Sequence, residues 1–148
     1  MSIRPADSRD ASDLAFLRFR WRSTERGKRG LDEDSYKEAL ELWMREHETS
    51  HVPFLVFDVQ RPVGMAWLAI VDRIPGPEFF VRRSAYMQSV YVAVDHRSRG
   101  VGSALMMRLV DFAREGGLHY LAVHPSEESF DSYQRLGFEH SNRVLELR

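Results

Sequence analysis

The stretch Gln88–Arg114, QSVYVAVDHRSRGVGSALMMRLVDFAR, decides the fold, and the rest of the chain is interpreted outward from it. Its pattern is typical of a strand, a short turn rich in arginine and glycine, and an amphipathic helix, in that order. Such a turn leaves the first backbone N–H groups of the helix free to point at whatever lies above it. The natural ligand is an anion, most often a phosphate.

The turn itself, residues 97–103, favours a pyrophosphate over a lone carboxylate. Gly100 and Gly102 lack the Cβ atoms that would keep a bulky anion away from the backbone. Arg97 and Arg99 can donate hydrogen bonds to phosphate oxygens. The three-glycine dinucleotide fingerprint and the Gly-Lys-Ser/Thr of a P-loop are both absent. A plain strand-to-helix turn, in which glycine serves geometry alone, is the alternative.

The region before this stretch predicts two helices. The first follows a short edge strand at residues 1–4, with Asp7 or Ser8 as its cap. The second spans about Asp34 to Glu48, where Ser35 and Glu38 have the spacing of a capping box. Strands are then expected in FLVFDV (54–59), VGMAWLAIV (63–71) and residues 86–94.

The region after the stretch predicts a strand–helix–strand unit and a last helix. The helix of residues 103–115 ends at Gly116-Gly117, and residues 118–123 form a parallel strand. Ser126 caps a helix that Gly137 ends, and residues 138–148 are expected to form a closing strand. Residues 1–148 are thus expected to form a single domain with an α+β, mixed-sheet fold.

Composition excludes several classes of protein. The chain has 148 residues, 43% of them hydrophobic and 29% charged, which describes an ordinary globule. A net charge of −1 favours neither a nucleic acid nor a membrane partner. Cysteine is absent, which excludes disulfides and thiolate chemistry. Because the N-terminus lacks the pattern of a secretory signal and no apolar run is of membrane length, we expect a cytoplasmic protein.

Three landmarks together resemble the GNAT-type N-acetyltransferase superfamily. Arg97-Ser98-Arg99-Gly100-Val101-Gly102 after Val90-Tyr91-Val92 is similar to its acetyl-coenzyme A (acetyl-CoA) signature. Ile3-Arg4-Pro5-Ala6 resembles the usual opening, and Tyr133-Gln134-Arg135-Leu136-Gly137-Phe138 resembles the closing Tyr-x-x-x-Gly-Phe. The resemblance implies a mixed, mostly antiparallel sheet, flanked by helices and splayed open beside its central strand.

The resemblance also implies roles for individual residues. Tyr133 would be the general acid that protonates the departing thiolate, because a phenol is mostly protonated at neutral pH. The pantetheine arm would pair with a strand, and a backbone N–H there could stabilise the oxyanion. Ser126 stands where the family commonly has an asparagine, and its hydroxyl would contact that arm. The cofactor-binding residues implied are Val90, Tyr91, Val92, Arg97, Ser98, Arg99, Gly100, Val101, Gly102, Ser103 and Ser126.

The sequence says less about the amine acceptor than about the acetyl donor. The resemblance implies a small-molecule amine or a peptide amine, no metal, and allows a homodimer. An alkylammonium must lose a proton before it attacks, and Glu25 is our first candidate for the base, acting through water. The arginine-rich segment 18–29 could bind an acidic acceptor, whereas a solvated helix face is the alternative.

Two rival functions stay open at this point. A non-catalytic module that binds or senses acyl-CoA would keep the phosphate turn and would not need Tyr133. His47-Glu48-Thr49-Ser50-His51 matches His-Glu-x-x-His, the zinc-binding pattern of certain hydrolases. This match lies at the weak end of a predicted helix, just before Pro53, so we expect a helix end and no metal site.

Overall fold

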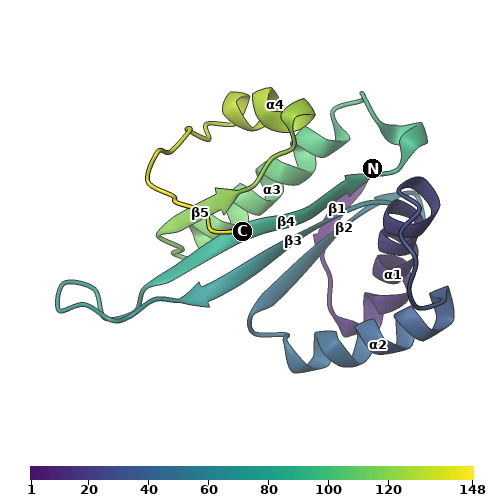
Figure 1. Ribbon diagram of the computed structural model, residues 1–148, viewed down its shortest axis with the longest axis horizontal. Helices are drawn as coiled ribbons and strands as arrows, with labels where there is room; N and C mark the ends of the chain where they lie inside the picture. The colour runs from purple at the N-terminus through teal and green to yellow at the C-terminus, as the bar shows by residue number, and fades with distance from the viewer.

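All 148 residues are described by the computed structural model, and they build one five-stranded sheet with helices on both faces (Figure 1). The strands follow one another across the sheet in chain order. Adjacent strands are antiparallel up to β4, whereas β5 lies parallel to β4. The predicted mixed, mostly antiparallel sheet is therefore confirmed. Its strands are β1 Ser2–Pro5, β2 His51–Asp58, β3 Arg61–Asp72, β4 Arg83–Val92 and β5 Tyr120–Val123.

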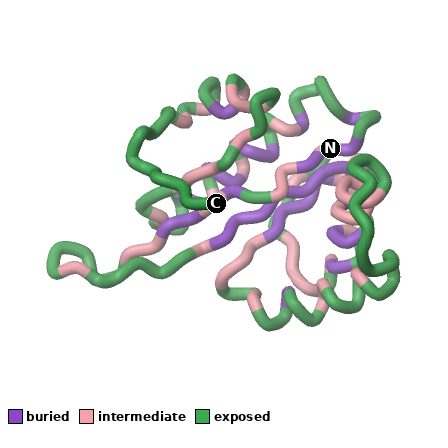
Figure 2. Tube along the Cα trace, viewed as in Figure 1, coloured by how far each residue is buried: buried purple, intermediate pink, exposed green.

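The sheet divides the hydrophobic core into two layers, and helices cover each layer. α1 and α2 lie on one face of the sheet, and α3 and α4 lie on the other (Figure 1). Because neighbouring strand residues point to opposite faces, Phe54 packs in the α3 layer and Leu55 in the α1–α2 layer. Buried residues accordingly run along the central strands (Figure 2). The α-helices are α1 Ala11–Phe19, α2 Glu33–Glu46, α3 Val101–Glu115 and α4 Phe130–Arg135. None of them has the length and apolar character needed to cross a membrane.

The helix starts confirm one predicted cap and correct another. Asp7 is the cap before α1, since its carboxylate accepts from the Arg9 N–H at 2.9 Å and opens a short 3-10 turn. The capping box expected at Ser35 is wrong. Asp32 caps α2 instead, and its Oδ1 accepts from the Ser35 N–H at 2.9 Å. A carboxylate three residues earlier is the stronger acceptor, so Ser35 becomes the donor.

A turn of π-helix continues α1 through Arg20–Glu25, and the sequence pattern did not predict it. π-Turns are rare and occur frequently at functional sites, because they re-aim the side chains that follow. Here the turn carries the end of α1 toward the loop that follows β4, where Glu25 forms an ion pair with Arg97.

The C-terminal segment corrects a further prediction. Residues 138–148 form no strand. The polar run His140-Ser141-Asn142 divides the segment, so each half is too short to hold a ladder on its own. Leu145 and Leu147 are consequently 97% and 101% exposed.

A buried histidine ties the β2–β3 turn to the loop after β4. His96 is 5% exposed. Its Nε2 lies 2.9 Å from Asp58 Oδ2 and its Nδ1 lies 3.0 Å from Asp95 Oδ1. Arg61 completes the group with an ion pair to Asp95 at 3.1 Å. The hydrogen bonds to Asp58 and Asp95 raise the pKa of His96, and those to His96 lower the pKa of each aspartate.

This cluster predicts how stability depends on pH. The contribution of His96 is fully present below its unfolded-state pKa of 6.5 and is lost as pH rises through its raised folded-state pKa. We therefore expect the free energy of unfolding to fall between about pH 6 and about pH 9 by more in the native protein than in His96→Gln. Urea unfolding at both pH values measures the difference. Equal pH dependence in the two proteins would contradict the assignment.

Candidate active site

β4 has a free edge beyond the point where it leaves β5. On one side it pairs with β3 as far as the Gly64–Val92 pair. On the other side its pairing with β5 covers only residues Ser84 to Met87. The backbone groups of residues 88–92 that point to that side therefore have no strand partner there, and one of them, the Val92 carbonyl, accepts from the side chain of Arg97. An extended ligand can bind there as an additional strand would.

A β-bulge interrupts this free edge. Met65 and Trp67 of β3 lie opposite Tyr91 and Gln88 of β4, so β4 holds one residue more than its partner. Ser89 absorbs the difference with a left-handed φ of 53°. The bulge changes which residues face each layer, because Met87 belongs to the α3 layer and Tyr91 to the α1–α2 layer. Bulges of this kind are frequent beside active sites.

The turn after β4 presents a row of free backbone N–H groups. The first helical hydrogen bond of α3 runs from the Ala104 N–H to the Gly100 carbonyl at 3.0 Å. The N–H groups of residues 98–103 have no acceptor in the protein. Ser98 and Gly100 both have positive φ angles, 60° and 79°, which curls these groups into a concave nest. Together with the α3 dipole, the nest is suited to an anion.

The glycines keep this nest accessible. A Cβ atom placed on Gly102 would meet only Val92 Cγ2, at an ordinary 3.8 Å. A Cβ atom on Gly100 would meet nothing within 4 Å. The space above the turn is therefore left open by the protein itself, so a bulky anion can approach the backbone. This geometry suits the role that the resemblance implies for residues 98–103, which stays a prediction, but it does not include the side chain of Arg97.

Arg97 does not point at the nest. Its Nε donates to the Val92 carbonyl at 2.8 Å, and its Nη2 lies 3.2 Å from Glu25 Oε1. Its guanidinium also lies 5.5 Å from the centre of the Tyr91 ring. The structure thus brings Arg97 and Glu25 together at the free edge, whereas Arg99 stays exposed at the turn without an ion-pair partner.

Tyr91 is buried behind that ion pair. Its ring stacks on Trp21 at 5.6 Å between centroids. The hydroxyl is buried without a hydrogen-bond partner. Burial raises its pKa, and the nearby carboxylate of Glu25 raises it further. The side chain therefore belongs to the α1–α2 layer. The backbone groups of Tyr91 point toward β3, because the Ala93 N–H donates to the Val63 carbonyl and successive residues of a strand alternate between its two neighbours.

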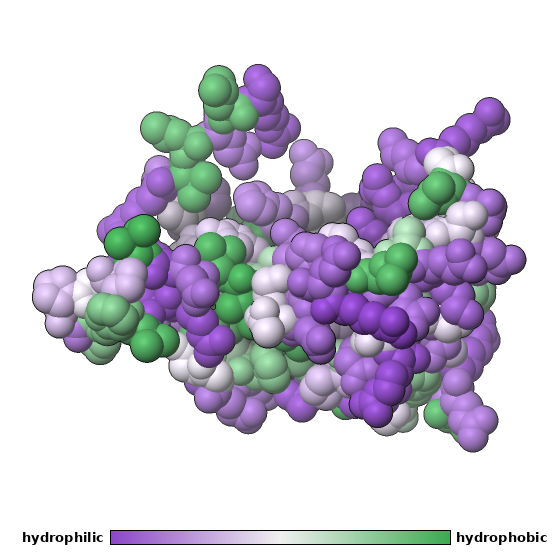
Figure 3. Space-filling view, turned by 90° about the horizontal axis from the view of Figure 1, so that it is seen from below, coloured by the Kyte–Doolittle hydropathy of each residue, from purple (hydrophilic) through white to green (hydrophobic).

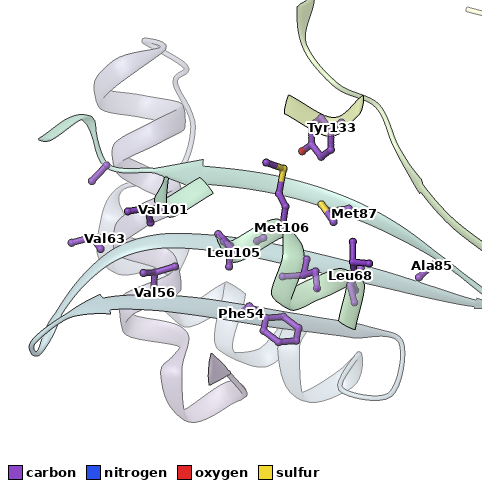
Figure 4. Packing of buried hydrophobic residues seen from close by; sticks show 14 residues of the cluster. Phe54, Val56, Val63, Leu68, Ala85, Met87, Val101, Leu105, Met106 and Tyr133 are labelled. Carbon is purple, nitrogen blue, oxygen red and sulfur yellow. The ribbon is translucent and has the colours of Figure 1, made fainter. Parts of the chain in front are cut away.

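Tyr133 enters from α4 on the opposite side of the sheet. It packs with Met87 and Met106 in the α3 layer and meets Phe138 edge-on at 5.5 Å (Figure 4). Its hydroxyl forms no hydrogen bond within the protein. Burial raises its pKa to about 12, so the phenol stays protonated at neutral pH and can donate. It also lines a cavity of about 1050 Å³ between β5, α4 and the C-terminal segment.

The remaining predicted residues divide between the turn and the core. Val90 and Val92 are half-buried against the α3 layer, and Val101 belongs to it. Ser103 is exposed at the start of α3. Ser126 opens the short turn before α4, where its Oγ lies 2.9 Å from Ser129 Oγ.

The His-Glu-x-x-His match does not form a helical pair of ligands. α2 ends at Glu46, and His51 already belongs to β2. The Nδ1 of His47 donates to the Trp43 carbonyl at 2.7 Å, and the Nδ1 of His51 lies 2.8 Å from Ser50 Oγ. Nowhere in the protein do three His, Cys, Asp or Glu side chains gather closely enough to hold a metal ion.

Comparison with protein families finds one match over most of the chain. The profile of the Acetyltransferase (GNAT) family matches residues 15–138, which include the free edge of β4, the anion nest and Tyr133. An uncharacterised N-acetyltransferase of Methanocaldococcus jannaschii is 26% identical over 97% of this chain and 62% of its own length. A glucosamine 6-phosphate N-acetyltransferase of Trypanosoma brucei brucei is 32% identical over 45% of each protein. An L-amino acid N-acyltransferase of Escherichia coli is 37% identical over 38% of this chain and 34% of that protein. The chain thus spans less than two thirds of the length of each of these relatives.

Solved structures share the fold at lower identity. A predicted acetyltransferase from Clostridium acetobutylicum, solved with acetyl-CoA, has a TM-score of 0.79, 23% identity, and coverage of 99% of this chain and 95% of that one. An integron cassette protein of Vibrio cholerae has a TM-score of 0.81 at 18% identity, covering 99% of this chain and 90% of that one. These similarities establish that the sheet and its helices are arranged as in acetyltransferases.

Proposed function

Because the chain belongs to the GNAT acetyltransferase family, we propose that it transfers an acetyl group from acetyl-CoA to a primary amine. The observation that carries this proposal is the continuity of the free β4 edge with the nest of free N–H groups at α3. One end of this surface suits a pyrophosphate and the other suits an extended amide chain. Acetyl-CoA carries both groups in that order.

The nest is the proposed holder of the pyrophosphate. The N–H groups of residues 98–103 would donate to its oxygens, and exposed Arg99 would add a charged donor. No protein group has to leave these N–H donors first. Hydrogen bonds to charged groups contribute about 1.5–3 kcal/mol each, so a few of them account for firm binding.

The free edge is the proposed track for the pantetheine arm. Val90 would exchange backbone hydrogen bonds with its amides, as in strand addition, and the Val92 N–H would donate to it, because the Val92 carbonyl already accepts from Arg97 Nε. The track leads from the nest back to the bulge at Ser89. A backbone N–H released from the ladder at the bulge would donate to the thioester carbonyl and stabilise the negative charge that develops on its oxygen.

The proposed reaction is a direct acyl transfer. The neutral amine attacks the thioester carbon, a C–N bond forms, and the C–S bond breaks. Tyr133 gives its proton to the departing sulfur, and its pKa of about 12 keeps that proton in place until the thiolate needs it. The proton lost by the amine passes to water and to Glu25, and solvent restores the proton on Tyr133. The products are an amide and coenzyme A.

We propose a small amine as the acceptor, because two relatives are named for such substrates, glucosamine 6-phosphate and L-amino acids. The test is thiol release from acetyl-CoA in the presence of a panel of amines, with calorimetry of acetyl-CoA binding beside it. We expect saturable binding and amine-dependent thiol release. Absence of acetyl-CoA binding would overturn the proposal at its first step.

Glu25 gives a separate prediction. Glu25→Gln is expected to lower kcat by about tenfold to a hundredfold, because it removes the final proton acceptor and keeps the shape of the side chain. The affinity for acetyl-CoA should change little, because the Arg97 Nε still donates to the Val92 carbonyl. Steady-state kinetics and calorimetry measure the two quantities.

A matched control for Glu25→Gln is Glu33→Gln, which changes an exposed acid in the first turn of α2. We expect native kinetics from it. Weaker acetyl-CoA binding with unchanged kcat in Glu25→Gln would contradict the role in proton transfer. It would show instead that Glu25 serves to hold Arg97.

A further inference from the structure

Arg18 occupies a special position on the acceptor side of the bulge. It lies in the last turn of α1 and is partly buried. Its Nη1 donates to the hydroxyl of Ser89, the residue that forms the bulge. The guanidinium therefore lies against the strand at the point where the proposed track ends, on the face covered by α1 and α2.

The positive charge of Arg18 has no counterion in the protein. Six other arginines form ion pairs with carboxylates, and none of these lies between residues 18 and 29. The one acid in that segment, Glu25, is already paired with Arg97. Within residues 18–29, all six cations are therefore left without an ion pair: Arg18, Arg20, Arg22, Arg26, Lys28 and Arg29. The face of the molecule seen in Figure 3 is largely hydrophilic, with smaller hydrophobic patches between the polar side chains.

The guanidinium of Arg18 has hydrogen-bond donors left over. It has five N–H donors, and Arg18 uses one of them on Ser89. None of its nitrogens is buried without a partner, so the other donors are open to solvent and accessible to a ligand. An anionic group at this place would take up the remaining donors, and the fork of the guanidinium matches the two oxygens of a carboxylate or phosphate.

Aromatic side chains hold Arg18 in place. Its Cζ lies 5.9 Å from the ring centre of Trp21, which itself stacks on Tyr91. On the α2 side, burial raises the pKa of the Tyr36 hydroxyl, while the nearby charge of Arg18 acts to lower it. The guanidinium is thus held between α1, α2 and the bulge of β4, and its direction toward the strand is set before any ligand binds.

From this position we infer that the acceptor is an amine that also carries an anionic group, a carboxylate or a phosphate, bound by Arg18. The inference rests on the proposed acetyl transfer, because it places the attacking amine at the bulge where the track ends. An anion held by Arg18 beside Ser89 would bring an amine a few bonds away to the same place. Arg18 then acts as the residue that determines acceptor specificity.

The test compares matched acceptors and matched variants. The acceptors are propylamine, β-alanine and O-phosphoethanolamine, so that the carboxylate and the phosphate form separate arms. The native protein is expected to prefer at least one anionic acceptor over propylamine in kcat/KM. Arg18→Met, which keeps the apolar stem, should reduce that preference by about tenfold to a hundredfold, mainly through KM. Arg18→Lys should fall between the two, because a lysine keeps the charge and loses the fork.

Controls separate this inference from the proposed function. Arg22→Met removes another unpaired cation of the same segment and should leave the preference unchanged. Calorimetry with β-alanine and O-phosphoethanolamine, in the presence of coenzyme A, measures acceptor binding without turnover. An unchanged preference in Arg18→Met would overturn the inference and leave acetyl transfer intact. Anion binding that depends on Arg18, without any thiol release, would support the inference and overturn the proposed reaction.

Discussion

Tyr133→Phe is expected to lower kcat by about a hundredfold to ten-thousandfold, the range typical of a lost general acid. The substitution removes only the hydroxyl, and that hydroxyl forms no hydrogen bond within the protein. The ring keeps its edge-on contact with Phe138, so folding stability should change little. Affinity for acetyl-CoA should also stay near the native value. Steady-state kinetics, calorimetry and urea unfolding measure the three effects.

Tyr120→Phe is the control, because it removes the hydroxyl of an exposed tyrosine on β5. We expect native turnover from it. The rival function, a module that binds acyl-CoA without catalysis, predicts that Tyr133→Phe changes no response to the ligand. Native kcat in Tyr133→Phe would therefore remove Tyr133 from the mechanism, whereas weak acetyl-CoA binding would give the residue a role in the cofactor site.

Gly100→Val is expected to weaken acetyl-CoA binding by about tenfold to a hundredfold. Gly100 has a φ of 79°, a conformation that costs a non-glycine residue about 1–2 kcal/mol and a β-branched residue more. The turn can relieve this strain only by rotating the peptide groups on either side. That rotation would misalign the N–H groups of residues 98–103, and each lost hydrogen bond to a charged oxygen costs about 1.5–3 kcal/mol. Calorimetry with acetyl-CoA measures the loss.

Gly117→Val is a closely matched control at the other end of α3. Gly117 has a φ of 67°, and, as at Gly100, a Cβ atom added to it would meet nothing within 4 Å. We expect both variants to lose similar stability in urea, and only Gly100→Val to lose affinity. An equal loss of affinity in the two variants would mean that general destabilisation of α3, and no local effect at the nest, weakens binding.

Local signals in the sequence were enough to predict the anion nest. Gly100 stands where a left-handed residue must connect a strand to a helix, and an apolar stripe marks α3 immediately after it. The strand–turn–helix order depends on neighbours in the chain, so propensity and periodicity suffice. The pairing of β2 with β3 could be predicted from the sequence as well, because their long apolar runs have few alternative partners.

The bulge could not be predicted in the same way. Serine has no intrinsic preference for the left-handed conformation that Ser89 adopts, and the sequence shows no sign of it. The extra residue is recognisable only from the register between β3 and β4, which packing on both faces of the sheet decides. The π-turn after α1 depends on tertiary contacts for the same reason.

The sequence also could not predict which charged residues that are far apart in the chain form contacts with each other. Glu25 and Arg97 meet across 72 positions of the chain, and Asp58 meets His96 across 38. Each contact depends on how the tertiary structure positions the two segments that carry the residues. Both participants of the first pair were singled out individually, Arg97 for the cofactor and Glu25 for the acceptor, and their contact with each other was not foreseen.

The bulge has a consequence for how the length of β4 can vary. Met87 and Val90 face the α3 layer although three positions separate them, because one residue is looped out between them. The strand therefore runs in two phases, one before Ser89 and one after it. Loss of the looped-out residue would restore regular alternation, because Met87 and Val90 would then stand two positions apart and every later side chain would keep the face it has now. The strand can therefore lose one residue at the bulge and keep its core side chains in place, but the loss would remove the interruption of the ladder and the hydroxyl that Arg18 contacts.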